Sequence, residues 1–387
     1  MSAREELEKL LSESVASART RGATAFDEIA GGRPIVLFGA GGLGKKIALV
    51  LEKLGRPAVA FADNNRARVG EKVAGVPILA TEDAVAKYGD DAVFVVAVWR
   101  APATERMSDR IERLVQLGAK HVTSFATLAW KHPAELLPYY AMDLPHQVIE
   151  AKDDVMRAFE LLADEPSRRE YLSHLRLRLH LDFAGISDPA DEPEYFTPNL
   201  VTLTKETSFV DCGAFDGDTA RSFLRCAPAD FAGRISAFEP DPGTFARLAA
   251  WRDSQPEDLK RRIAIHQAGV GARSETVTFA EGGGWGSAVS STGTTIRIVS
   301  LDETVADAKP TLIKVDVEGY DPDVVEGARK IITETTPTLA VCVYHRQDHP
   351  WRIPQQIAAM NPSYRYTLRT YCLDGFDLVL YCVPRTS

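Results

Sequence analysis

The chain has 387 residues, and 45% of them are hydrophobic, which is more apolar material than a single core usually holds. We therefore expect two domains and a connecting segment. The formal net charge of -9 offers no broad cationic surface to a phosphate backbone or an anionic membrane, so neither nucleic acid nor a membrane is an expected partner.

The chain has five cysteines, an odd number, and no two of them form a CxxC pair. This usage is typical of buried, reduced thiols and not of a structural zinc site. The first residues are charged and helical in pattern, and no apolar run of about 18 residues occurs. The sequence therefore predicts a cytoplasmic protein with neither a secretion signal nor a membrane span.

The first part of the chain, residues 1–145, has the pattern of a nucleotide-binding fold. Residues 4–30 have apolar side chains at helical spacing, which predicts one leading amphipathic helix. From Pro34 an apolar run, a glycine cluster, a helical segment and two more apolar runs follow, the last at 92–99. This alternation predicts a parallel sheet with helices between its strands.

A glycine motif, GxGxxG, lies between the first strand and the first helix of this part: Gly39, Gly41 and Gly44. Asp63 follows the second strand, where an acidic residue can accept hydrogen bonds from a ribose. The motif predicts a nucleotide site, so a NAD-dependent oxidoreductase is one alternative function. However, no hydride-transfer residues accompany it, and the segment VGEKVAGVPIL resembles small domains attached to sugar-modifying transferases. We expect substrate binding or packing in a homo-oligomer ahead of NAD chemistry.

The rest of the chain is predicted as a helical connector, residues 146–194, and a second domain, residues 195–387. In the second domain, a new alternation of strands and helices starts at SFVDCGAFDGD and ends in two apolar runs that predict an antiparallel hairpin. The predicted fold class is therefore α/β, with two doubly wound Rossmann-like domains joined by the connector.

The first turn of the second domain is a candidate cofactor site. A strand ends at Asp211, a glycine-containing turn follows, and a helix begins near Thr219. Asp211, Gly213 and Gly217 have the spacing found in class I methyltransferases, although Phe215 replaces the usual middle glycine. The next strand ends in Glu239, which can accept hydrogen bonds from both ribose hydroxyls, and Asp241 lies in the turn beyond. A pyridine-nucleotide fold, or a carboxylate that only caps the turn at Asp241, is the alternative.

A charged segment, KVDVEG, is a candidate acceptor site. Lys314, Asp316 and Glu318 alternate, so on a single strand all three would share one face. A structural ion-pair ladder is the alternative, but charges at the carboxyl edge of such a sheet are more often functional. The following strand ends near His345, at the same edge. We therefore expect this edge to line the acceptor pocket.

Four segments occur together in the second domain: DCGAFDGDT, FEPDP, KVDVEGYDPDVVEGA and YHRQDHPWRIP. In this combination the chain resembles the FkbM family of methyltransferases over roughly residues 195–384. The resemblance implies a class I methyltransferase fold that binds S-adenosylmethionine through Asp211, Gly213, Gly217 and Glu239. It also implies that Asp316, Glu318 and His345 face the acceptor, a hydroxyl of a sugar or secondary metabolite.

For transfer to an alcohol, a side chain must take the hydroxyl proton, and His345 is the first candidate and Asp316 the second. Glu318 is expected to orient the base or to bind another hydroxyl. We assign no metal ligand, although Asp316, Glu318 and His345 bracketing a magnesium or manganese ion is an open alternative. The glycine-rich stretch at 281–293 is interpreted as a loop over the site or as an exposed turn. A non-catalytic nucleotide-sugar binding module, suggested by Phe215, is a further alternative.

Overall fold

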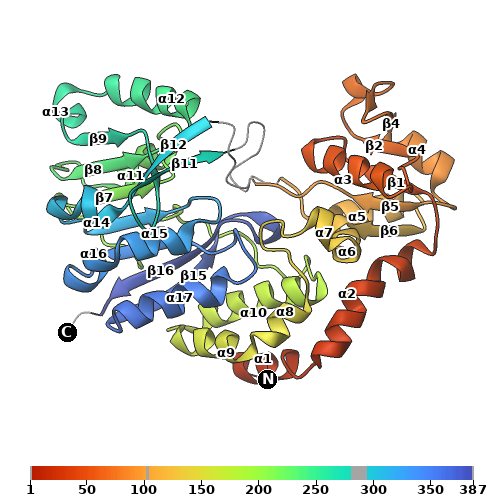
Figure 1. The fold of residues 1–387 in the computed structure, drawn as a ribbon, viewed down its shortest axis with the longest axis horizontal. Coiled ribbons are helices and arrows are strands. Elements are labelled where there is room, and N and C mark those ends of the chain that lie inside the picture. Colours follow the sequence, from red (N-terminus) through yellow and green to blue (C-terminus); the bar gives the residue numbers. More distant parts are fainter. Residues whose placement is uncertain (1, 102–103, 280–293, 386–387) are drawn as a thin grey trace. The chain divides into compact units, whose positions relative to one another are not determined.

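The computed structural model describes residues 2–101, 104–279 and 294–385, and it divides into two compact units (Figure 1). Unit 1 comprises Met1–Lys152, Arg169–Pro189 and Cys372–Phe376. Unit 2 comprises Asp153–Arg168, Ala190–Tyr371 and Asp377–Ser387. Residues 146–194, predicted as a connector, are divided between both units.

Unit 1 is built on a six-stranded sheet in the order β3-β4-β2-β1-β5-β6. The strands are β1 (Ile35–Phe38), β2 (Ala60–Asp63), β3 (Lys72–Val73), β4 (Val76–Ala80), β5 (Val93–Val96) and β6 (His121–Ser124). All neighbours are parallel except the edge pair β3 and β4. Every residue of β1 and β5 is buried, as expected for central strands covered on both faces. The predicted parallel sheet is confirmed.

The helices of unit 1 are α1 (Ala3–Leu10), α2 (Val15–Ala30), α3 (Gly42–Lys53), α4 (Thr81–Tyr88), α5 (Met107–Gln116), α6 (Phe125–Lys131), α7 (Pro133–Leu136) and α8 (His146–Glu150). Most of α10 (Glu165–His180) also belongs to it. The prediction of one leading helix is wrong, because the helix is interrupted before Ser14. The hydroxyl of Ser14 accepts a hydrogen bond from the backbone N–H of Ser17 at 3.1 Å and so starts α2.

Unit 2 is built on a seven-stranded sheet in the order β15-β16-β14-β13-β7-β8-β9. The strands are β7 (Ser208–Cys212), β8 (Arg234–Phe238), β9 (Ile263–His266), β13 (Leu312–Val315), β14 (Thr338–Cys342), β15 (Tyr364–Thr370) and β16 (Leu378–Pro384). The strand β16 is antiparallel to both β14 and β15, and the other pairs are parallel. The predicted closing hairpin and the α/β fold class with two such sheets are confirmed.

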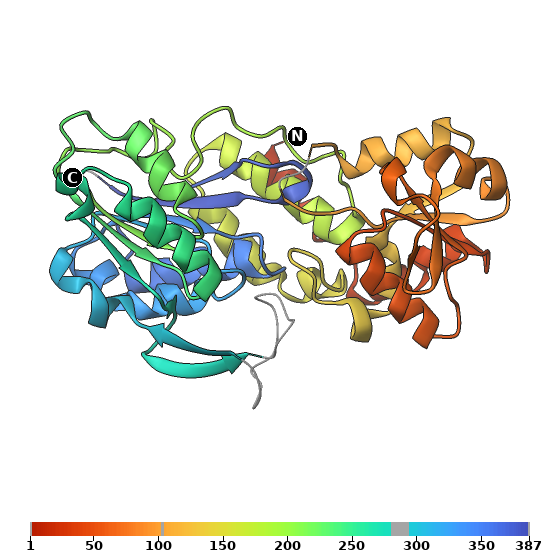
Figure 2. The same ribbon diagram turned by 90° about the horizontal axis from the view of Figure 1, so that it is seen from above.

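A second, three-stranded sheet in unit 2 has the order β10-β12-β11 and forms a ribbon that stands off the main sheet (Figure 2). Its strands are β10 (Gly269–Val270), β11 (Glu275–Phe279) and β12 (Thr294–Val299). The glycine-rich stretch predicted as a loop at 281–293 lies outside the described residues.

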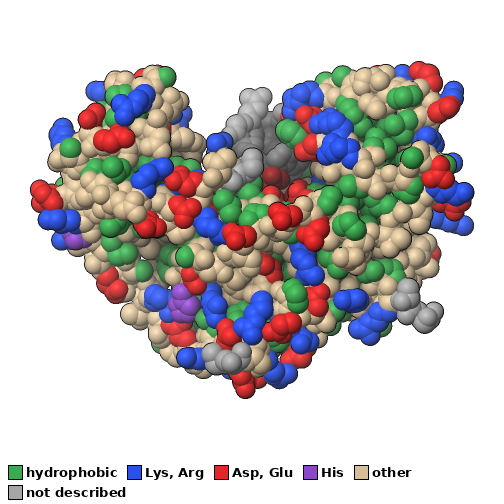
Figure 3. Space-filling view, turned by 180° about the vertical axis from the view of Figure 1, so that it is seen from behind, with side chains coloured by type: hydrophobic (Ala, Val, Ile, Leu, Met, Phe, Trp, Pro, Cys, Tyr) green, Lys and Arg blue, Asp and Glu red, His purple; other side chains and the backbone are tan. Residues whose placement is uncertain are grey.

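The helices of unit 2 include α9 (Lys152–Leu161), α11 (Asp218–Cys226), α12 (Pro242–Asp253), α13 (Glu257–Lys260), α14 (Leu301–Thr304), α15 (Asp321–Gly327), α16 (Arg329–Glu334) and α17 (His349–Met360). Within the described residues, no helix has the length and apolar content needed to cross a membrane. On the face in Figure 3, Lys and Arg side chains are interspersed with Asp and Glu, which agrees with the absence of a net positive charge.

Candidate active site

A cavity of about 740 Å³ lies at the carboxyl ends of β7, β8 and β13 in unit 2. In the sheet, β7 has β8 as its neighbour on one side and β13 as its neighbour on the other. The direction in which strands are added along the sheet therefore reverses at β7. Open α/β sheets bind ligands at such a reversal. Five predicted site residues line the cavity: Gly213, Phe215, Glu239, Asp316 and Glu318. The other four predicted site residues of this unit are not among the described residues that line the cavity: Asp211, Gly217, Asp241 and His345.

The turn after β7 needs its glycines because the backbone is left-handed and the surroundings are close. Gly213 has a φ of 86°, and a Cβ there would lie 1.9 Å from the backbone oxygen of Asp316. Gly217 has a φ of 91° and precedes α11, and its Cβ would lie 2.7 Å from the ring of Trp251. A side chain fits neither position, so both glycines are needed for the turn, and Gly213 itself lines the cavity.

Phe215, which stands in place of the middle glycine, keeps the left-handed backbone with a φ of 46°. Its side chain is 51% exposed and lines the cavity, and the guanidinium of Arg247 lies 5.4 Å from the ring centroid. The substitution therefore retains the turn conformation and adds an aromatic wall, so it does not indicate a degenerate turn.

Glu239, at the end of β8, joins two turns and lines the cavity. Its Oε2 accepts a hydrogen bond from the backbone N–H of Phe215 at 3.1 Å, and its Oε1 accepts from that of Asp241 at 2.8 Å. Burial raises the pKa of Glu239 to about 7. Each carboxylate oxygen can accept more than one hydrogen bond, so both oxygens of Glu239 can also accept hydrogen bonds from the hydroxyls of a ligand. The Asp241 side chain instead caps α12, because its Oδ1 accepts from the backbone N–H of Thr244 at 2.7 Å.

Lys314 and Asp211 form a buried ion pair beneath the turn. The Lys314 Nζ lies 3.1 Å from Asp211 Oδ1, and it donates a hydrogen bond to the backbone oxygen of Gly213 at 2.7 Å. Burial opposes the charge, but Asp211 and Asp316 together raise the pKa of Lys314 above its ordinary value. Asp211 thus supports the turn through Lys314, from below the cavity.

Asp316 and Glu318 were expected on the same strand face as Lys314, and this expectation is wrong. The strand β13 ends at Val315, and Glu318 has a left-handed φ of 54°, so both acidic residues lie in the turn beyond the strand. Both still line the cavity. The turn, and not strand periodicity, directs them there.

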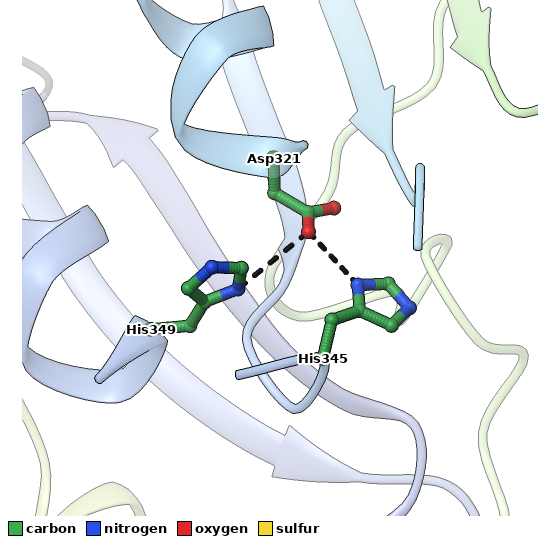
Figure 4. A group of neighbouring side chains, drawn as sticks. All are labelled: Asp321, His345 and His349. Atoms are coloured by element: carbon green, nitrogen blue, oxygen red, sulfur yellow. Dashed lines mark hydrogen bonds and ion pairs between the residues drawn. The ribbon is translucent and has the colours of Figure 1, made fainter. Parts of the chain in front are cut away.

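His345 lies behind Asp316 and is held between two carboxylates. Its Nε2 is 3.2 Å from Asp316 Oδ1, and its Nδ1 is 2.8 Å from Asp321 Oδ2 (Figure 4). Despite burial, Asp321 and Asp316 raise the pKa of His345 well above its ordinary value. Burial likewise opposes ionisation of Asp316, yet Lys314 and His345 lower its pKa. Both side chains are therefore poor proton acceptors near neutral pH.

The cavity is also lined by residues that the sequence did not indicate, among them Glu194, Tyr195 and Asp377. The Tyr195 hydroxyl donates a hydrogen bond to Asp316 Oδ2 at 3.1 Å. The Oε1 of Glu194 is buried without a hydrogen-bond partner among the described residues. Burial, together with the neighbouring Asp377 carboxylate, raises the pKa of Glu194 to about 8. Glu194 lies in a Pro- and Asp-rich stretch that has the composition of a linker, and no motif marks it.

The glycine motif of unit 1 follows β1 and extends into the start of α3. Gly39 has a φ of 103°, and a Cβ on Gly44 would lie 2.0 Å from the backbone oxygen of Gly39, so both positions require glycine. Gly41 is the N-cap of α3 and has open space around it. Asp63 accepts hydrogen bonds from the backbone N–H groups of Ala40, at 2.7 Å, and Asn65, at 2.8 Å. Asp63 thus ties two turns together in the manner of Glu239.

Comparison with known proteins matches each unit to a family. Residues 211–368 match the sequence model of the methyltransferase FkbM domain, and residues 34–110 match that of the PglD N-terminal domain. No curated protein matches the chain.

The crystal structure of a methyltransferase FkbM from Methylobacillus flagellatus KT is similar, with a TM-score of 0.76 and 22% identity over 96% of this chain and 99% of that chain. This similarity shows a shared fold. Aeropyrum pernix fibrillarin in complex with S-adenosylmethionine has a TM-score of 0.31, with 14% identity over 48% of this chain and 70% of that chain. UDP-D-quinovosamine 4-dehydrogenase from Vibrio fischeri has a TM-score of 0.20, with 21% identity over 24% and 76%. These two scores are too low to show a shared fold. The match of residues 211–368 identifies them as an S-adenosylmethionine-dependent methyltransferase domain of the FkbM family, and residues 34–110 form a PglD N-terminal domain.

Proposed function

We propose that unit 2 transfers a methyl group from S-adenosylmethionine to a hydroxyl of a small molecule, a sugar or a secondary metabolite. One observation carries the proposal. A single cavity places Glu239 and the glycine turn of a methyltransferase domain next to three carboxylates, Glu194, Asp316 and Glu318. A cofactor site and a site for a hydroxylated acceptor would therefore share one cavity.

The cavity fits the cofactor in size and charge. A volume of about 740 Å³ is within the range of small-molecule sites. Its acidic lining residues are Glu194, Asp218, Glu239, Glu275, Asp316, Glu318, Asp323 and Asp377, and its basic ones are Arg273 and Lys314. When bound, S-adenosylmethionine supplies an electrophilic methyl group on a cationic sulfonium, and this acidic lining favours a cation. We assign Glu239 to the ribose hydroxyls and the turn with Gly213, Phe215 and Gly217 to the rest of the cofactor, with Asp211 as support.

At the acceptor end, we assign Glu194 as the general base that takes the proton of the reacting hydroxyl. This proton must leave the acceptor as the new bond to carbon forms, and a side chain with a pKa near the working pH is suited to take it. Glu194 combines a raised pKa with a buried oxygen that has no hydrogen-bond partner among the described residues, and it lines the cavity.

His345 then acts by positioning. It does not line the cavity, but it holds Asp316, and Asp316 and Glu318 accept hydrogen bonds from other hydroxyls of the acceptor. The same acidic lining disfavours phosphorylated acceptors, so a neutral polyhydroxylated compound or an amino sugar fits better than a nucleotide-linked sugar.

For unit 1 we propose that Gly39, Gly41, Gly44 and Asp63 hold part of a substrate or support packing in a homo-oligomer. The alternatives of NAD-dependent oxidation and of a non-catalytic sugar-nucleotide module predict different ligands for the same turns. The five cysteines are free thiols, which favours the cytoplasm as the place of the reaction.

Calorimetric titration of the full chain with S-adenosylmethionine, and separately with NAD, tests the proposal. We expect saturable binding of S-adenosylmethionine that Glu239→Ala weakens and that Glu257→Ala, an exposed control on α13, leaves unchanged. A panel of neutral sugars, amino sugars and sugar phosphates, assayed by release of S-adenosylhomocysteine, then tests the acceptor class. Binding of NAD without S-adenosylmethionine, or turnover of sugar phosphates in preference to the neutral sugars, would contradict the proposal.

A further inference from the structure

Behind the cavity of unit 2, three buried side chains converge on one point (Figure 4). They are Asp321, the first residue of α15, His349, the first residue of α17, and His345, which follows β14. Asp321 Oδ2 lies 2.8 Å from Nδ1 of His345 and 3.5 Å from Nδ1 of His349. The three donor atoms all lie within 4.8 Å of one another, and each side chain is at most 1% exposed.

We propose that Asp321, His345 and His349 bind one divalent transition-metal ion. Two imidazole nitrogens and one carboxylate oxygen form a donor set that suits zinc, manganese, iron or cobalt. Magnesium and calcium prefer sites made of oxygen atoms, so this centre differs from the bracket of Asp316, Glu318 and His345 considered from the sequence.

The surroundings of the three side chains orient them as ligands. A histidine that binds a metal usually has a carboxylate beside its other ring nitrogen, and His345 Nε2 forms an ion pair with Asp316 Oδ1 at 3.2 Å. The backbone N–H groups of Val317 and Gly319 donate hydrogen bonds to the two oxygens of Asp321, each at 3.2 Å. These contacts fix both the ring and the carboxylate before any ion arrives.

His349 supplies a second, independent observation. Its Nδ1 is buried and makes no hydrogen bond among the described residues, and its nearest ionic partner is Asp321 Oδ2 at 3.5 Å. A buried polar atom without a hydrogen bond is costly, and an ion placed between His349 and Asp321 would satisfy it.

The balance of buried charge also favours a divalent ion. Three carboxylates contact Lys314 or His345 and have side chains at most 27% exposed: Asp211, Asp316 and Asp321. Lys314 is the one ammonium group in contact with them within the described part of the chain. With neutral imidazoles, the three carboxylates and Lys314 carry a net charge of -2, which a divalent ion would balance. An uncompensated buried charge is costly, so this balance favours an ion between the three side chains.

Such an ion would have a structural role. None of its three ligands lines the cavity, but Asp321 binds the turn that carries Asp316 and Glu318. The metal would therefore fix the acceptor end of the cavity from behind, and it goes beyond the proposed methyl transfer because its presence does not depend on which acceptor is used.

Cobalt(II) is a suitable probe because its visible absorption reports its ligands. Because the ligands are buried, the untagged full chain is produced in cobalt-supplemented medium, and its metal content and spectrum are measured. We expect about one equivalent of cobalt with absorption typical of nitrogen and oxygen ligands. His349→Gln is expected to lose the ion, and Asp316→Asn, which removes the partner of His345, to bind it about 10–100-fold more weakly. His121→Gln, on β6 of unit 1, is the matched control and should retain it.

Absence of stoichiometric cobalt in the wild-type protein, or equal retention by His349→Gln, would overturn the proposal. A second measurement needs no variant. Nitrogen-15 NMR of the wild-type protein with saturating zinc should show His345 as a neutral, metal-bound imidazole, and an unchanged imidazolium signal would reject the site. Binding of S-adenosylmethionine is measured on the same samples, so a failure of the metal site is distinguished from a failure of the proposed function.

Discussion

Replacing Lys314 by Met should destabilise unit 2 strongly, because it removes the cation from a buried ion pair. Lys314 Nζ lies 3.1 Å from Asp211 Oδ1, and the two side chains are 2% and 0% exposed. Removing one partner of such a pair leaves an uncompensated charge and costs about 3–5 kcal/mol. Lys314 also donates to the backbone oxygen of Gly213, so Lys314→Met should loosen the cofactor turn as well.

The double variant Lys314→Met with Asp211→Asn separates the charge from the packing. It removes both charges, so we expect it to recover most of the lost stability, because uncharged replacements of a buried pair are often close to neutral. Native-state hydrogen exchange of the amides in β7 and β13 measures the opening free energy of this unit without assuming two-state unfolding of the whole chain. A loss of less than about 1 kcal/mol in Lys314→Met, or a double variant as unstable as the single one, would refute the reasoning.

Three further predictions concern the cavity. Glu194→Gln should retain binding of S-adenosylmethionine and reduce methyl transfer by about 10²–10⁴-fold. The wild-type rate should rise as the pH approaches 8, where Glu194 loses its proton, and a variant rate with the same rise would count against this base. The folded state holds the proton of Glu239 up to a pKa of about 7, whereas the unfolded chain releases it near the ordinary value of 4.5. As the pH rises between these values, the wild-type protein should therefore lose stability relative to Glu239→Gln. Urea unfolding at several pH values measures this, and a free energy of unfolding that changes equally with pH in both proteins would contradict the shifted pKa. Gly213→Ala should lower stability by at least about 1–3 kcal/mol and weaken S-adenosylmethionine binding, because its Cβ would lie 1.9 Å from a backbone oxygen. Gly243→Ala, whose Cβ would approach no closer than 3.4 Å, is the control for thermal unfolding, and equal losses in both would reject this explanation.

The local pattern of the sequence was sufficient for the two α/β sheets, the glycine turns and the closing hairpin. Short apolar runs that alternate with amphipathic helical segments are typical of the buried strands of a parallel sheet. Turns with positive φ at Gly39, Gly213 and Gly217 require glycine at single positions, which the sequence shows directly. Glu239 could be predicted because a carboxylate at the end of the second strand occupies a position that the fold itself defines. The predicted cofactor half of the cavity depended on these short-range features.

The acceptor half depended on tertiary structure. Glu194 and Asp377 are far apart in the sequence, and only folding brings their carboxylates close enough to raise the pKa of Glu194. The sequence placed His345 at the carboxyl edge of the sheet. It could not show that His345 is buried behind Asp316, where Asp321 contacts its other ring nitrogen. Strand periodicity also could not show that β13 ends at Val315, because the chain there leaves the sheet to place Asp316 and Glu318. Burial and charge depend on which segments meet, and the order of residues within one segment does not contain that information.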